Sequence, residues 1–210
     1  MKKNSRILAV AGVVGAAAMA FTGVAAGHAD AGKLPGSFKH KNLGDGNGIT
    51  IRLYDESVRV SRAVTNIPTS REAWVTGKIA VSTTGDIEGA TITAGYLVGC
   101  QLNFGADAGA GTGDIALDSP SLEGASGTGG FNLGPGEAGF YPIIKASVDG
   151  EDVNSISFAN GRGGLAYSQE RFGVDGCAGH ASARALVKVQ VSTDTFKGNV
   201  TTYGKPFSLG

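Results

Sequence analysis

The stretch QLNFGADAGAGTGDIALDSPSLEGASGTGGFNLGPGEAGF, residues 101–140, decides how the chain is organised. It contains eleven glycines and five carboxylates but no Lys or Arg, and nothing basic occurs between Lys78 and Lys145. Composition alone fits a flexible, acidic, Gly-rich loop. The other interpretation is a long extended hairpin with one face toward water and the other toward lipid.

The hydrophobic pattern within this stretch favours the hairpin. Residues 101–112 alternate with a period of two, and their twelve positions suit a tilted barrel strand, which needs about 9–11 residues. A second alternating run returns from Ala138 to Asp149, after a break near Pro135. The tip between the arms, roughly Gly113 to Gly130, carries three of the carboxylates. We therefore predict a barrel-forming hairpin over about residues 101–147.

The flanking sequence predicts an all-β rim domain formed by residues 32–100 and 148–210. A turn at residues 44–48 leads into a strand over Ile49–Tyr54. Arg71–Thr83 reads as a strand pair or one long strand, and Val58–Val64 as a strand or a short helical turn. Further strands are expected at Thr91–Phe104 and at Ala185–Val191.

The N-terminus, residues 1–31, has the features of a secretory signal peptide. A basic start (Lys2, Lys3 and Arg6) precedes an apolar run over Ile7–Ala26 and the small-residue site Ala29-Asp30-Ala31. Cleavage is expected after Ala31, or alternatively after Ala29. The competing interpretation is an uncleaved membrane anchor. The remaining chain is close to neutral, and nothing in it suggests binding to nucleic acid.

A single hairpin cannot close a barrel, because two strands leave two open edges. Unpaired backbone groups in hydrocarbon cost several kcal/mol each, so a membrane-crossing hairpin needs partners. If the hairpin spans a membrane, several chains must contribute one each. The sequence then implies a homo-oligomer with cyclic, head-to-tail contacts.

The chain contains partial matches to cofactor and metal motifs, but the sequence around each match does not support that function. The G-x-G-x-x-G at residues 134–139 is interrupted by Pro135, and no helix follows it. The turn at 44–48 places Ile49 where a calcium loop needs an oxygen ligand. No G-x-S-x-G occurs. We expect no enzyme activity, no cofactor and no metal site.

The two cysteines, Cys100 and Cys177, suggest a disulfide, because an exported chain with an even number of cysteines often pairs them. Cys100 lies at the predicted base of the hairpin, and Cys177 lies in a Gly-rich turn. The alternative is two buried thiols.

Motifs spread along residues 32–210 make the chain resemble the MspA-type porins of mycolic-acid-containing actinobacteria. The most specific is the C-terminal Thr-Thr-Tyr-Gly-Lys-Pro-Phe, residues 201–207. Other matching segments are Gly44-Asp45-Gly46, Ser70-Arg71-Glu72 before Trp74, Gly95-Tyr96, Leu102-Asn103-Phe104 and Gly163-Gly164-Leu165-Ala166.

The resemblance implies a β-sandwich rim from which each of eight subunits contributes one hairpin to a transmembrane β-barrel. It implies an outer-membrane channel that passes small hydrophilic solutes and ions, is in contact with membrane lipid and has an acidic constriction. Ten and fourteen positions after Phe104 stand Asp114 and Asp118, which we expect at the constriction. Their wider spacing predicts a less acidic or wider ring.

The remaining carboxylates of the stretch, Asp107, Glu123 and Glu137, are expected to line the pore. Because rings of carboxylates favour cations, cation selectivity is expected. The alternative function is a secreted β-sandwich binding or adhesion module with a disordered Gly-rich loop. A secreted hydrolase, the third possibility, has no supporting constellation of residues.

Overall fold

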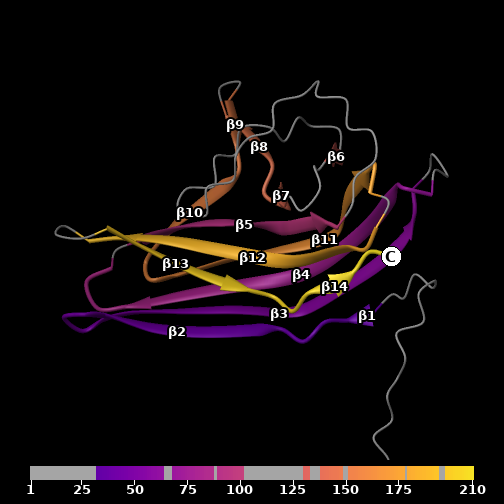
Figure 1. The fold of residues 1–210 in the computed structure, drawn as a ribbon. Helices are drawn as coiled ribbons and strands as arrows, with labels where there is room; N and C mark the ends of the chain where they lie inside the picture. The colour runs from indigo at the N-terminus through magenta and orange to yellow at the C-terminus, as the bar shows by residue number, and fades with distance from the viewer. Residues whose placement is uncertain are drawn as a thin grey trace, which may run out of the picture.

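The computed structural model describes residues 32–63, 68–87, 89–101, 130–132, 138–148, 151–177, 179–193 and 197–210. Every regular element in these ranges is a β-strand, which confirms the all-β prediction (Figure 1). Within them no helix is long and apolar enough to cross a membrane.

The first sheet has the order β1-β3-β4-β11-β6, with β2 also paired to β3. Its pairs are antiparallel except for β6, which runs parallel to the end of β11. Its strands are β1 (Gly32–Lys33), β2 (Ser37–Gly44), β3 (Asn47–Arg62), β4 (Arg71–Thr84), β6 (Gly130–Asn132) and β11 (Arg162–Asp175).

The second sheet has the order β10-β5-β12-β13 and is antiparallel throughout. In addition, β7 pairs with β5 and β14 pairs with β12. Its strands are β5 (Gly89–Cys100), β7 (Ala138–Pro142), β10 (Ser155–Ala159), β12 (Ala181–Ser192), β13 (Lys197–Tyr203) and β14 (Phe207–Ser208). A separate two-stranded ribbon joins β8 (Ala146–Val148) to β9 (Glu151–Val153).

The two sheets pack face to face around one hydrophobic core. The core follows from period-two patterning, since alternate residues of a strand point to the same face. In β5, for example, Ile92, Ala94, Tyr96 and Val98 are fully buried. From the other sheet Phe172 of β11 stacks on Tyr96, with ring centroids 5.5 Å apart. Side chains of both sheets therefore form a single β-sandwich.

The structure resolves two alternatives that the sequence left open. Residues 58–62 continue β3, and residues 71–84 form one long strand, β4. The turn at residues 44–48 is a plain hairpin turn between β2 and β3, with positive φ at Gly44, Asp45 and Gly46.

The beginning of the returning run, predicted as part of the hairpin, pairs within the sandwich. Strand β7 pairs along β5, with Ala138 opposite Gly99 and Pro142 opposite Gly95. The physical reason is burial: Tyr141, Ile143 and Ile144 enter the core of the sandwich. A period of two marks a strand but does not distinguish lipid from a protein core.

Candidate functional site

The acidic stretch leaves the sandwich at a covalently fixed point, the end of β5. Cys100 is joined to Cys177 by a disulfide, with the two Cα atoms 5.8 Å apart, and both residues are buried. The next residue, Gln101, donates its backbone N–H to the carbonyl of His180 at 3.0 Å. The exit of the chain is therefore held to the segment between β11 and β12 by a covalent bond and a hydrogen bond.

The return of the chain is anchored through Tyr141 of β7. Its hydroxyl donates to the backbone carbonyl of Arg171 in the opposite sheet, and its ring centroid lies 5.4 Å from that of Phe172. Lys145 donates to the same hydroxyl and lies 4.1 Å above the ring. Ile143 adds a backbone hydrogen bond to Ala94 of β5 at 3.0 Å. Both sides of the stretch thus start from one rigid sandwich.

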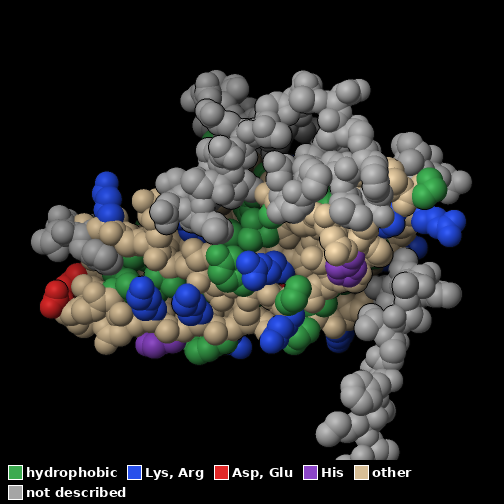
Figure 2. All heavy atoms as spheres, in the orientation of Figure 1, with side chains coloured by type: hydrophobic (Ala, Val, Ile, Leu, Met, Phe, Trp, Pro, Cys, Tyr) green, Lys and Arg blue, Asp and Glu red, His purple; other side chains and the backbone are tan. Residues whose placement is uncertain are grey.

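Charge is divided between the sandwich and the acidic stretch. Of the 18 Lys and Arg residues, all except Lys2, Lys3 and Arg6 lie in the described ranges. Figure 2 shows them spread over the visible face of the sandwich, while Asp and Glu are visible at one end. The stretch itself contributes carboxylates only. Residues 79–144 therefore contribute no fixed positive charge.

The residues predicted to line the pore lie outside the described ranges. They are Asp107, Asp114, Asp118, Glu123 and Glu137. Their roles stay predictions. The structure does place the two cysteines together, as the sequence suggested.

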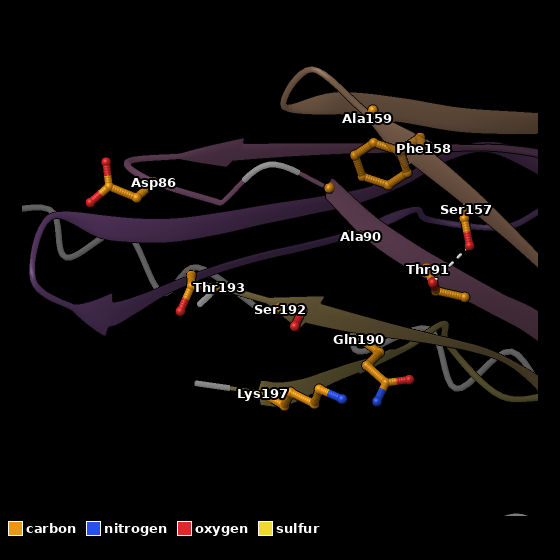
Figure 3. A pocket seen from close by; sticks show the side chains of 11 residues that line it. Asp86, Ala90, Thr91, Ser157, Phe158, Ala159, Gln190, Ser192, Thr193 and Lys197 are labelled. Atoms are coloured by element: carbon orange, nitrogen blue, oxygen red, sulfur yellow. Dashed lines mark hydrogen bonds between the residues drawn. The ribbon is translucent and has the colours of Figure 1, made fainter. Parts of the chain in front are cut away.

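A shallow polar groove of about 570 Å³ lies at the opposite end of β5, near Gly89 (Figure 3). Ser157 of β10 and Thr91 of β5 hydrogen-bond there at 2.9 Å. Asp86 and Lys197 also line the groove. Sequence reasoning did not find it, because its walls come from four separate segments of the chain. In the described ranges no three His, Cys, Asp or Glu residues gather as metal ligands.

A buried polar cluster connects the two sheets and was also missed from the sequence. Glu56 of β3 is 1 % exposed, and its Oε1 accepts a hydrogen bond from Tyr96 of β5 at 3.0 Å. The Tyr96 hydroxyl lies 2.9 Å from that of Tyr167 in β11. The cluster therefore links β3 and β11 of the first sheet to β5 of the second sheet through hydrogen bonds.

Two β-bulges create this cluster. Pairing of β3 with β4 shifts between Tyr54 and Ser57, and pairing of β11 with β4 shifts between Tyr167 and Glu170. Asp55 and Gln169, one in each bulge, have positive φ angles of 52° and 57°. An extra residue in a strand re-aims its neighbours, which turns Glu56 inward.

A disulfide-linked β-sandwich that carries a long acidic stretch without Lys or Arg is consistent with a porin-like class of protein. The MspA family model matches residues 45–208. The chain therefore belongs to the MspA family, whose members are oligomeric channel-forming porins of the outer membrane. No curated protein matches the chain.

Proposed function

We propose that the chain forms a cation-selective channel for passive diffusion of small hydrophilic solutes and ions across the outer membrane. The proposal includes export through a cleaved signal peptide and assembly into a ring of identical subunits, eight by the resemblance noted above. Its support is the family membership together with the stretch that lacks cations between two anchors on the sandwich.

Assembly follows from the physics of the bilayer. An isolated hairpin in lipid leaves its edge N–H and C=O groups unpaired, and each costs several kcal/mol. Closing a ring of hairpins pairs every edge with the next subunit. We propose that residues 101–137 of each chain provide that hairpin, since β7 returns to the sandwich at Ala138.

The proposed cation selectivity follows from the repetition of the same carboxylates in every subunit. In a closed ring, one Asp per chain becomes a circle of carboxylates. We propose that Asp114 sets the narrowest charged level, with Asp118 close by and Asp107, Glu123 and Glu137 also lining the lumen. The Debye length is about 8 Å at physiological salt, so such a ring is only partly screened. Circles of Asp or Glu attract cations and repel anions.

Planar-bilayer recording of the purified protein tests this function. A detergent extract of the cell envelope should contain an SDS-resistant oligomer that produces stepwise conductance increases. A soluble monomer without conductance would contradict the proposal and favour the adhesion module.

A further inference from the structure

The buried cluster of Glu56, Tyr96 and Tyr167 suggests a property that passive diffusion does not require. We propose that the folded sandwich holds Glu56 as the neutral acid, and that loss of this proton loosens residues 204–210 from the sandwich. The cluster would then be a pH-sensitive element in the domain that carries the channel. This inference does not depend on the conduction path.

The surroundings of Glu56 do not compensate a negative charge. Its Oε2 is buried and has no hydrogen-bond partner in the described part of the chain. An ionised carboxylate removed from water is very costly unless it is paired. In the described ranges the two ion pairs lie elsewhere: Lys78 pairs with Asp55 at 3.0 Å, and Arg171 with Glu72 at 3.5 Å.

None of the described residues placed beside the Glu56 carboxyl group carries a positive charge. Tyr96 comes from β5 and Tyr167 from β11. On β3 itself, Asp55 is exposed and neutralised by Lys78. In the C-terminal segment Gly204 lies beside the carboxyl group, while the neighbouring Lys205 is exposed. Within the described ranges, the hydrogen-bond partner of the carboxyl group is the Tyr96 hydroxyl, which in turn contacts the Tyr167 hydroxyl.

The hydroxyl chain accommodates either state of the acid. When Glu56 is ionised, Tyr96 donates to Oε1 and Tyr167 donates to Tyr96. When the proton is on Oε1, both contacts run in the opposite sense, because hydroxyls act as donors and acceptors. Oε2 is then a carbonyl oxygen without a donor, which costs far less than an unpaired charge.

The C-terminal segment is the part of the fold that closes over Oε2. A Cβ at Gly204 would lie 3.2 Å from this oxygen, so the backbone passes directly against it. Gly204 donates to the carbonyl of Ala185 at 2.9 Å, and Leu209 to that of Ala181 at 2.8 Å. In this proposal, water reaches an ionised Oε2 by displacing this segment.

The direction of the pH effect follows from burial. Desolvation raises the pKa of Glu56 from 4.5 to about 7, and the hydrogen bond from Tyr96 opposes this only in part. The folded state then binds the proton more tightly than the unfolded state. The contribution of Glu56 to stability is fully present below pH 4.5 and is lost as the pH rises toward 7. The folding equilibrium constant should fall by up to about 300-fold across this range.

Hydrogen exchange of the purified mature oligomer tests the proposal. Peptides that cover residues 204–210 are compared with peptides from β4 between about pH 5 and pH 8.5, after correction for intrinsic exchange rates. In the wild type, protection of residues 204–210 relative to β4 should fall at least about tenfold. In Glu56→Gln it should stay constant. Glu72→Gln, whose carboxylate lies beside Arg171, should behave as the wild type.

Constant protection in the wild type, or the same fall in Glu56→Gln, would overturn the proposal. If Glu56→Gln does not fold, infrared spectroscopy of the wild type decides. At about pH 6, ordinary Asp and Glu side chains are ionised, so a carbonyl band of a protonated carboxyl group must remain and must disappear above about pH 8. Its absence at about pH 6 would equally overturn the proposal.

Discussion

The ring of Tyr167 lies directly over Gly77, its partner across the β4–β11 pair. A Cβ at residue 77 would be 2.5 Å from the Tyr167 hydroxyl oxygen and 2.7 Å from Cζ. Because residue 77 has no side chain, the Tyr167 hydroxyl can reach Tyr96 in the opposite sheet. The glycine is thus a requirement of the buried cluster.

Gly77→Ala should lower the free energy of unfolding by about 1–3 kcal/mol, since overpacking forces side chains and backbone to shift. Denaturant unfolding followed by the near-UV signal of tyrosine measures this. Gly32→Ala is the matched control, because nothing lies within 4 Å of a Cβ at that position. Equal stability of the two variants would show that Tyr167 moves aside freely.

The Cys100–Cys177 disulfide should be present in the purified protein and should stabilise it. The bond closes a loop with a sequence separation of 77, so replacing both cysteines with Ala should cost about 2–4 kcal/mol. Intact-mass measurement after alkylation, with and without reductant, establishes the pairing. Two alkylated thiols in the unreduced protein would contradict it.

Deleting residues 105–136 should leave a folded, soluble sandwich that does not conduct. The deletion removes β6, which contributes only three residue pairs at the edge of the first sheet. The core strands and the disulfide remain. Circular dichroism reports the fold and bilayer recording the conductance. Channels formed by the deletion protein would place the pore elsewhere.

The double variant Asp114→Asn and Asp118→Asn should lower cation preference, and the effect should shrink at high salt. The zero-current potential in a salt gradient measures it. Asp86→Asn is the control, because Asp86 lies in the groove at the far end of β5. If the double variant is unchanged, Glu123 and Glu137 become the next candidates for the constriction.

Much of the sandwich could be predicted from periodicity, and even the bulge of β3 left a signal. Ile49, Ile51 and Leu53 are buried at odd positions, whereas Val58 and Val60 are buried at even positions. The change of parity marks an inserted residue. Because the change of parity resembles the end of a strand, the sequence predicts two segments where the structure has the single strand β3. Glu56 has the same parity as the buried valines but was hidden by its residue type, since Glu is rarely buried.

The site was harder to predict, for a different physical reason. Tyr141 and Ile143 belong to an alternating run like that of residues 101–112, and only their contacts show that they pack in protein. The proposed depth of Asp114 in a pore would be set by contacts with neighbouring subunits. Those contacts are not encoded as a local pattern in a single chain. The pairing of the two cysteines, by contrast, could be predicted from their number and the predicted export signal.

The disulfide also makes the region from Cys100 to Cys177 a closed covalent ring. This ring includes the whole acidic stretch, β7 and the full length of β11. An extracellular protease that cuts one peptide bond anywhere within it produces no free fragment, because both new ends remain attached through the cystine. The two pieces of a nicked chain therefore stay covalently joined until a reductant opens the bond.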